Sequence, residues 1–537
     1  KGVEEIPLMH NKNIYLTQKS LYVGGVPFQK YPHPTRRLFM HHKNIKLAVR
    51  KQLKKQFPNW KRLSRKSKKE LARNVLAEVV NEYDFKQDIK ASIGELLTIE
   101  TQSPTKGIIS LDKMAGFIDM FNNNRILKFS SNKRLSTLLV DEELYFIDRL
   151  IDNGIINRLL AYDGYSPAMR ELFPANLLRA ELLKAIKYSE ISYRKFCTEE
   201  YLGLDRKQNR FFIGLPLHRK TLIDHTRLCQ FRSSLSFTQQ INLMVYFLHY
   251  FKQSGLLGDC HLHGVDSTEL ANECRIPLAS LKINGKKIRI YDDIDCDCGV
   301  RRNKRDKSKY VIGYRLHTLT AIDAKTGHSF PLVSILASAN HHDSHFLPFL
   351  VKLAQAMGLD IQLVTADEAY HDKDGFLFQE TGVIVTTPAS VNVSIPQHVD
   401  KVSGAVFCHD SCDVAMQRVA FENQTHEYKC GAEPGECQHS SSCPQCRYIM
   451  ADGGQFQQIP AATEQINQAH EIRKNCERTF NLLKNQTGME TVRVRSQHAT
   501  MVRCALSSMA VLLIKMAGFR RKEKPAQCQT ELFSKAA

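Results

Sequence analysis

Apolar positions follow a helical period in the part of the chain that begins near residue 140. Two groups, within 144–151 and 177–186, place Leu and Ile three or four residues apart, which is typical of amphipathic helices. Strand-like runs are scarce before residue 258. The pattern therefore predicts a helical region over 136–257.

The pattern changes after Gly258. Short runs rich in β-forming residues occur at 261–266, 312–322, 329–336, 361–366 and 382–387, with a helical stretch at 346–357. This alternation predicts an α/β domain, a mixed sheet flanked by helices. A stretch rich in Cys, Gln, Gly and Pro interrupts it, and a helical pattern resumes near Ala461. We expect a domain split into 258–387 and 461–518, an insertion at 388–460 and a tail at 519–537.

Composition fits a folded protein with several cores, since 43% of the 537 residues are hydrophobic and 24% are charged. The net charge of +20 favours a polyanionic partner, with nucleic acid ahead of a membrane surface. Residues 36–73 alone hold 15 Lys or Arg and one acid. This basic N-terminal region, 1–135, either contacts DNA or forms a solvated helix surface.

A second group of basic residues lies in the helical region and is compatible with a helical DNA-binding domain or with ordinary solvent-exposed faces. It comprises Arg194, Lys195, Arg206, Lys207, Arg210, Arg219 and Lys220.

Membrane insertion is not expected. The apolar stretch 504–514 is closed by Arg503 and Lys515, whereas a span needs about 20 apolar residues. The first residues lack the apolar segment of a secretory signal, so we expect a cytoplasmic, nucleoid-associated protein.

Cysteine spacing marks the insertion as a candidate metal site. Six of the 15 cysteines lie there: Cys408, Cys412, Cys430, Cys437, Cys443 and Cys446. Tetrahedral Zn²⁺ takes four N or S ligands, and the last two cysteines form a C-x2-C pair of suitable bite. We expect four of the six to hold a structural zinc. Reduced core cysteines and an iron–sulfur cluster are the alternatives.

Three carboxylates stand out by position. Asp266 and Asp367 each follow an apolar run, so both would lie at strand ends, where ligands collect in open α/β sheets. Glu477 shares one stripe of a predicted helix with His470, Arg473 and Lys484. Taken singly, each aspartate could be a cap or turn residue, and the stripe could be a solvated, ion-paired face. Together, three carboxylates suit two Mg²⁺ ions, which catalyse in-line phosphoryl displacement.

The acidic run 292–297 resembles a calcium loop only superficially. The loop glycine is displaced, and the twelfth position counted from Asp293 is Lys304. Because basic residues follow at 301–305, we expect an exposed, charge-segregated loop, close to DNA.

These motifs, in this order, resemble bacterial insertion-sequence transposases of the DDE class with a Y-x2-R-x3-E-x6-K signature. The chain reads His470-x2-Arg473-x3-Glu477-x6-Lys484, with His in place of Tyr. The other matching segments are 265–268, 312–317, 339–344 and 365–370, with 191–197 and 222–225 upstream. The resemblance spans about 140–515.

The resemblance implies an RNase H-like catalytic domain in which Asp266, Asp367 and Glu477 hold two Mg²⁺ or Mn²⁺ ions. It also implies that His470, Arg473 and Lys484 contact DNA near the scissile phosphate. The expected reaction is cleavage at element ends followed by strand transfer into target DNA, by a homodimer on double-stranded DNA. A metal-dependent nuclease without strand transfer and an inactive DNA-binding descendant are the alternatives.

Overall fold

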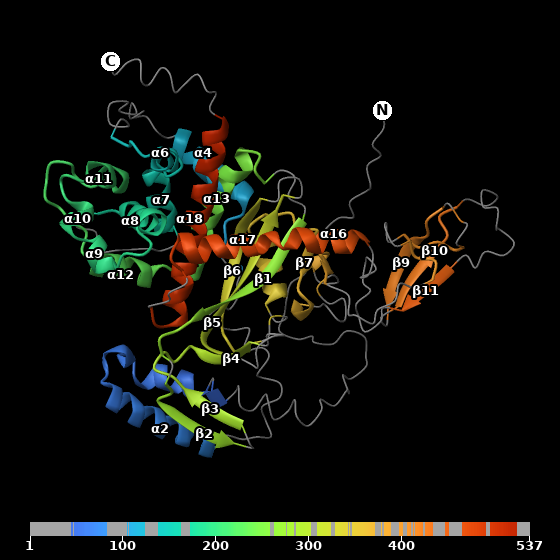
Figure 1. The fold of residues 1–537 in the computed structure, drawn as a ribbon, viewed down its shortest axis with the longest axis horizontal. Helices are drawn as coiled ribbons and strands as arrows, with labels where there is room; N and C mark the ends of the chain where they lie inside the picture. Colours follow the sequence, from blue (N-terminus) through green and yellow to red (C-terminus); the bar gives the residue numbers. More distant parts are fainter. Residues whose placement is uncertain are drawn as a thin grey trace.

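The computed structural model describes residues 45–82, 105–123, 138–162, 172–257 and 262–523, apart from short gaps within these ranges. A mixed sheet occupies the centre, a helical layer covers one side, and two small sheets lie at the periphery (Figure 1). The N-terminal residues 1–44, the tail after residue 523, Cys437 and Cys443 lie outside the described residues.

The central sheet has six strands in the described residues. Its strands are β1 (Leu262–Ala271), β4 (Asp297–Arg301), β5 (Lys309–Ile322), β6 (Ser329–Ser338), β7 (Leu363–Ala366) and β8 (Ile384–Thr386). β5 pairs antiparallel with β1, β4 and β6, whereas β7 and β8 run parallel to β1. The prediction of a mixed sheet flanked by helices is confirmed, and the five expected strands match β1, β5, β6, β7 and β8 within a few residues.

The helical layer contains α4 (Leu111–Asn123), α6 (Glu142–Asp148), α7 (Asn153–Tyr162), α8 (Pro174–Lys187), α9 (Tyr193–Phe196), α10 (Glu199–Leu202), α11 (Lys207–Ile213), α12 (His225–Ser234) and α13 (Phe237–Gln253). Local chemistry sets its boundaries. Ser236 and Gln239 form a reciprocal capping box at the start of α13. Gly214 ends α11 with φ +83°, a conformation that favours glycine.

One residue of the second basic group does not face solvent. The Arg210 side chain is fully buried and donates to the carbonyl oxygens of Leu202, Thr221, Pro216 and Arg219. A guanidinium can satisfy several loop carbonyls at once because it carries five donors. Both interpretations of the second basic group, a DNA-binding surface and a solvent-exposed face, are therefore wrong for Arg210, which fixes the loop after α11.

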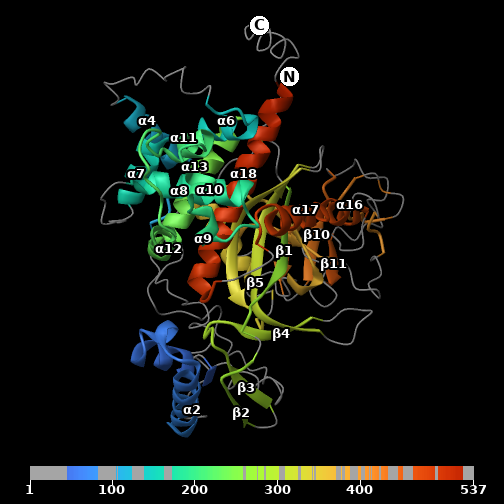
Figure 2. The same cartoon turned by 60° about the vertical axis from the view of Figure 1, so that its left-hand side comes forward.

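Helix α18 (Gln497–Glu523) joins the helical layer to the sheet (Figure 2). By length and composition its segment 497–518 could cross a membrane, which the shorter stretch 504–514 did not suggest. However, 72% of the apolar window is buried, where α18 packs on β6, α13 and α8. Burial in this core accounts for the apolar sequence.

The N-terminal unit, residues 45–82, packs beneath the sheet on a hairpin that the sequence pattern did not predict. The hairpin is β2 (Ala279–Ile283) and β3 (Lys286–Ile290). The unit contains a helix over 48–56, a turn at Trp60–Arg62 and α2 (Arg65–Glu82). Its apolar side chains, Val49, Leu53, Trp60 and Leu76 among them, form one core cluster with Ile288 and Ile290 of β3.

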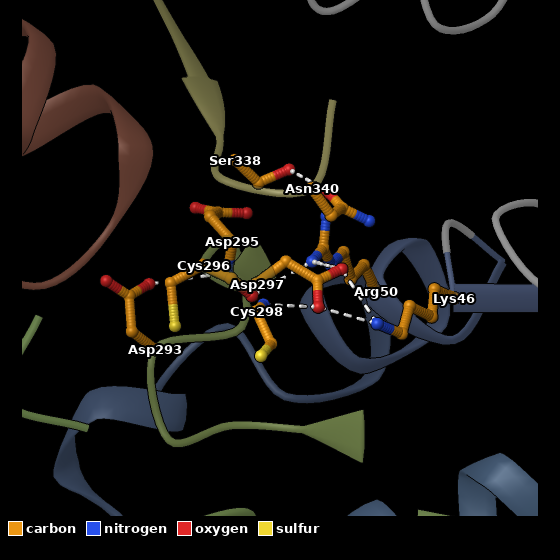
Figure 3. A network of polar contacts seen from close by, with 9 residues as sticks. All are labelled: Lys46, Arg50, Asp293, Asp295, Cys296, Asp297, Cys298, Ser338 and Asn340. Carbon is orange, nitrogen blue, oxygen red and sulfur yellow. Dashed lines mark hydrogen bonds and ion pairs between the residues drawn. The ribbon is translucent and has the colours of Figure 1, made fainter. Parts of the chain in front are cut away.

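Ion pairs fasten this unit to the acidic run 292–297. Figure 3 shows Lys46 and Arg50 pointing at the Asp297 carboxylate. The Nζ atom of Lys46 is 2.6 Å from Asp297 Oδ1. Arg50 also donates to the carbonyl oxygen of Cys296 at 3.0 Å. Asp297 is 1% exposed and Asp293 is 3% exposed. The expectation of an exposed loop is therefore wrong, because the run meets basic partners from a distant part of the sequence.

Further contacts join the N-terminal unit to the acidic run 292–297. Lys54 pairs with Asp295 at 2.7 Å, and Lys68 pairs with Asp292 at 2.8 Å. The indole Nε1 of Trp60 donates to the Asp292 carbonyl oxygen at 3.1 Å. Part of the basic N-terminal segment is thus paired with acids within the chain.

Residues between 388 and 460 include a small separate sheet, formed by β9 (Gln417–Glu422), β10 (Thr425–Lys429) and β11 (Cys446–Met450). It lies apart from the central sheet, at the right of Figure 1. Cys408 is buried in an apolar cluster with Val406, Met416 and Tyr428.

Candidate active site

Two aspartates lie at the edge of the sheet where β1 and β7 run side by side. Asp266 is in β1, directly after the four residue pairs that join β1 to β7. Asp367 follows the last residue of β7 and begins a short 3₁₀ turn, Glu368–Tyr370. The prediction that Asp266 ends a strand is wrong, because β1 continues beyond it to Ala271 and stays paired with β5. The parallel pairing of β1 with β7 does end just before each aspartate, at Val265 and Ala366, so the two aspartates lie side by side.

Glu477 reaches this edge from α17 (Asn475–Asn481), which packs across β1. Gly264 makes the close packing possible. A Cβ atom at Gly264 would lie 2.2 Å from the Cys476 sulfur and 2.9 Å from Ile322 Cδ1. Glycine at this position lets α17 approach β1 and brings Glu477, next to Cys476, toward Asp266.

The segment that carries Glu477 is not one regular helix. α16 (Glu464–Arg473) ends before α17 begins, and α17 continues into a π-helical turn at Leu482–Gln486. The predicted single stripe from His470 to Lys484 is therefore wrong in detail, because a π turn rotates Lys484 relative to the α-helical register. Such turns occur frequently at functional sites.

The guanidinium of Arg473 lies between the two aspartates. Its Nη1 is 3.5 Å from Asp266 Oδ2, and its Nη2 is 3.9 Å from Asp367 Oδ1. The predicted DNA contact of Arg473 stays a prediction; within the chain its guanidinium lies against the carboxylates. One positive charge thus already faces this carboxylate pair.

Burial raises the pKa of Asp266 to about 6. The Ser267 backbone N–H, 2.7 Å from Oδ1, and the Arg473 guanidinium oppose this rise. The negative charges of Asp367 and Glu477 add to it. All three predicted carboxylates therefore interact electrostatically, and a cation placed among them would stabilise the ionised forms.

The donor type of this set fits a hard divalent cation, since Mg²⁺ prefers carboxylate oxygens. Asp367 and Glu477 are exposed, so their oxygens are accessible. Within the described residues, no three His, Cys, Asp or Glu side chains converge closely enough to hold a metal ion. The carboxylates are thus brought to one edge without forming a closed ligand cage.

His470 is half buried rather than presented to solvent. Its Nδ1 lies 3.2 Å from the hydroxyl of Thr365 in β7. Burial lowers the pKa of His470, although the Thr387 backbone and the Asp367 charge act in the opposite direction. The ring is therefore a neutral group beside the site at physiological pH. Lys484 is partly exposed in the π turn.

The candidate zinc ligands are only partly described. Cys408, Cys412, Cys430 and Cys446 carry free thiols, while Cys437 and Cys443 lie outside the described residues. The zinc site stays a prediction.

Several polar residues that lie buried or half buried near the aspartates had no role assigned from the sequence. These are Arg315, His317, Asp343 and Tyr370. The sequence could have pointed to these residues, since each lies in a segment that contributed to the family resemblance. Periodicity alone did not reveal that they meet.

Comparisons with known proteins bear on this arrangement. Residues 285–513 match the family model described as a transposase DDE domain, a span that includes Asp367 and Glu477 and begins after Asp266. The match supports a DDE transposase, a DNA-processing enzyme. No curated protein matches the chain.

A solved structure, the piggyBac transposase synaptic complex with hairpin DNA determined by cryo-EM, aligns with 73% of this chain and 76% of its own. The identity is 11% and the TM-score is 0.27, a likeness too low to carry an argument.

Proposed function

We propose that this chain is a DDE transposase that cleaves DNA at insertion-sequence ends and transfers the cut strand into target DNA. The observation that carries the proposal is the position of Asp266 and Asp367 on either side of the Arg473 guanidinium, with Glu477 close enough in α17 for its charge to act on Asp266. The transposase DDE domain match, which contains two of the three, supports it.

Asp266, Asp367 and Glu477 would hold the divalent cation, Mg²⁺ or Mn²⁺, with two ions per site. When bound, such ions activate the attacking oxygen and stabilise the leaving oxygen of an in-line phosphoryl displacement. The chain's own contribution is to keep Asp266 and Asp367 adjacent on parallel strands and to bring Glu477 over them through Gly264.

Arg473 is the proposed phosphate-binding residue closest to the carboxylates, because its guanidinium lies within 4 Å of both aspartates. An arginine fork matches phosphate oxygens geometrically. Lys484 is a second candidate phosphate contact. For His470, the bond to Thr365 favours a role in holding α16 on β7 beside any DNA contact.

The domain division proposed is a basic N-terminal region (1–135), a helical DNA-binding domain (136–257), an RNase H-like catalytic domain (258–387 and 461–518) and a cysteine-rich, zinc-binding insertion (388–460). The mixed sheet carrying Asp266 and Asp367 supports the RNase H-like assignment. The separate small sheet supports an insertion, and the tail would be 519–537.

Double-stranded DNA is the proposed partner, and two ends would be held by a homodimer. Support comes from one surface of the N-terminal unit, the basic face: Arg62, Arg65, Lys66, Lys69 and Arg73, all exposed. No carboxylate pairs with these five side chains among the described residues. Beside three of them is a groove of about 350 Å³, lined by Arg65, Lys66, Lys69 and residues 276–278.

The test of this function is strand transfer from a labelled, pre-cut duplex that carries the terminal repeats flanking the gene. A transposase joins the free 3′-hydroxyl to target DNA in Mg²⁺, whereas a nuclease with the same carboxylates only cleaves. Joined product that is absent with Glu477→Ala and retained with Glu471→Gln supports the proposal. Glu471 is a matched control because it is exposed and pairs only with Lys474, nearby on the same segment. Cleavage without joining would overturn it.

A further inference from the structure

A polar network of three buried and two half-buried residues lies near the two aspartates. It consists of Ser267, Arg315, His317, Asp343 and Tyr370. The Ser267 hydroxyl donates to Asp343 Oδ2 at 3.2 Å, and Arg315 Nη1 donates to Asp343 Oδ1 at 2.8 Å. His317 Nδ1 lies 2.9 Å from the Tyr370 hydroxyl. Asp343, His317 and Tyr370 are 9%, 0% and 2% exposed.

The network is on the opposite face of the sheet from Glu477. Side chains alternate along a strand, so Asp266 shares the face of Gly264, which α17 covers, and Ser267 points to the other face. Ser267 is directly opposite His317 of β5 in the antiparallel register. None of the network side chains except Ser267 neighbours a proposed metal ligand in sequence.

Each aspartate is close in sequence to a residue of the network, Asp266 to Ser267 and Asp367 to Tyr370. Ser267 is the next residue after Asp266. Tyr370 closes the 3₁₀ turn of Asp367, since its backbone N–H donates to the Asp367 carbonyl oxygen at 2.9 Å. Ser267 and Tyr370 also interact through their side chains. The network therefore ties the middle of β1 to the turn after β7.

Asp343 and its neighbours in the network are held by further contacts. Arg315 holds Asp343 while its Nη2 donates to Glu269 Oε1 at 3.1 Å, and His317 stacks on Phe346 with ring centroids 4.3 Å apart. Phe346 donates its backbone N–H to the Asp343 carbonyl oxygen at 3.1 Å. Arg315 Nε and His317 Nε2 make no hydrogen bond among the described residues, so the rigidity rests on both carboxylate oxygens of Asp343, each of which accepts one.

We propose that Asp343 is a positioning residue. Through Ser267 and Tyr370 it fixes the separation of Asp266 and Asp367, and so sets the affinity of the site for the divalent cation. This inference rests on the proposed function, since it concerns the same carboxylates. Partners behind metal ligands commonly contribute 10- to 100-fold to metal affinity or activity.

The test measures Mn²⁺ binding by titration calorimetry on the full chain without DNA, beside thermal unfolding and DNA affinity in EDTA. Asp343→Asn is expected to weaken Mn²⁺ binding by about 10- to 100-fold, and Ser267→Ala by about 10-fold. DNA affinity in EDTA is expected to stay within about 2-fold of the wild type. Ser234→Ala is the matched control, because it removes a serine hydroxyl bonded only to the Phe231 carbonyl of α12.

A purely structural role gives a different result. Lower thermal stability with unchanged Mn²⁺ affinity in Asp343→Asn and Ser267→Ala would overturn the proposal. If Asp343→Asn does not fold, Ser267→Ala and Tyr370→Phe decide by the same criterion. A wild-type chain that neither binds Mn²⁺ nor cleaves DNA refutes the proposed function and this inference with it, whereas wild-type binding that the variants share refutes the inference alone.

Discussion

At the scale of single residues, Gly264 determines whether Glu477 can reach the aspartates. Gly264→Ala places a methyl group 2.2 Å from the Cys476 sulfur and forces α17 away from β1. We expect a loss of about 1–3 kcal/mol in stability and at least a 10-fold loss of DNA cleavage. Single-turnover cleavage and urea unfolding measure the two effects.

Two further variants test whether the Gly264→Ala effect comes from the clash with Cys476: one removes the clash, and the other is a control. Gly264→Ala combined with Cys476→Ala removes the clashing sulfur and is expected to recover part of the activity. Gly116→Ala, at an exposed helical glycine with no atom within 4 Å, should leave cleavage unchanged. Wild-type cleavage by Gly264→Ala would contradict the role assigned to this glycine.

Lys515 provides a pH-dependent prediction. It lies in α18 with its Nζ 5.3 Å from the centre of the Phe330 ring, and burial lowers its pKa to about 8. The pKa of an unfolded lysine is about 10.4. Between these values the unfolded chain binds more protons, so stability rises with pH; below pH 8 the full cost of burying the charge is present.

The Lys515→Met variant should remove this dependence. We expect it to be more stable than the wild type by about 1–2 kcal/mol at pH 7, a difference that shrinks between pH 8 and 10.5. Urea unfolding at intervals from pH 7 to 10.5 measures it. Lys184, whose pKa burial also lowers to about 8, is present in both proteins and cancels in the comparison. If the stability of the wild type and that of Lys515→Met change in parallel with pH, the lowered pKa of Lys515 is disproved.

At the scale of elements, local residue type predicted the longest parts of the fold. Runs of β-forming residues predicted β1, β5 and β6, and helical spacing of Leu and Ile predicted α6 and α8. The hairpin β2–β3 was missed, because its strands pair only with each other and its buried partners come from residues 45–82. The burial of acidic residues 292–297 was missed for the same reason.

The three carboxylates were singled out from apolar runs and a helical stripe, and their role as one site stays a prediction; Asp266 in fact lies within β1 rather than at its end. The position of Arg473 between the aspartates and the network around Asp343 were not predictable, because they depend on which faces meet in three dimensions. Arg210 was wrongly predicted to be exposed because it is basic. Its guanidinium is buried and donates hydrogen bonds to four backbone carbonyl oxygens.

The fastening of the N-terminal unit predicts unequal effects for two of its ion pairs. Asp297→Asn removes the carboxylate from Lys46 and Arg50 at a site 1% exposed, and should cost about 3–5 kcal/mol. Lys54→Ala breaks a pair whose lysine is 55% exposed, and should cost less than about 1 kcal/mol. Denaturant unfolding with hydrogen exchange over 48–56 compares them. Equal effects would show that the buried pair does not hold this unit.

At the scale of the whole molecule, the basic side chains of the N-terminal unit fall into two groups: some pair with acids within the chain, and others form the exposed basic face. On α2, Lys68, Ala72 and Leu76 face the core, while Arg65, Lys69 and Arg73 recur every four residues on the exposed side. The triple variant Arg65→Ala, Lys66→Ala and Lys69→Ala should lower the slope of log affinity against log salt by up to about 2.7.

Filter binding of duplex DNA over a range of salt concentrations measures that slope. Lys252→Ala with Lys429→Ala is the control, since each of these exposed lysines pairs with a carboxylate. An unchanged slope in the triple variant would show that DNA does not contact the basic face.

The most direct test of the central claim is Mg²⁺-dependent cleavage of a labelled duplex that carries the element's own terminal repeats. Wild type is compared with Asp266→Ala, Asp367→Ala, Glu477→Ala and the control Glu471→Gln. If the three carboxylates form one site, each alanine variant loses cleavage by several orders of magnitude while binding the duplex normally, and Glu471→Gln cleaves at the wild-type rate. Cleavage that persists in any one of the three would remove that residue from the site.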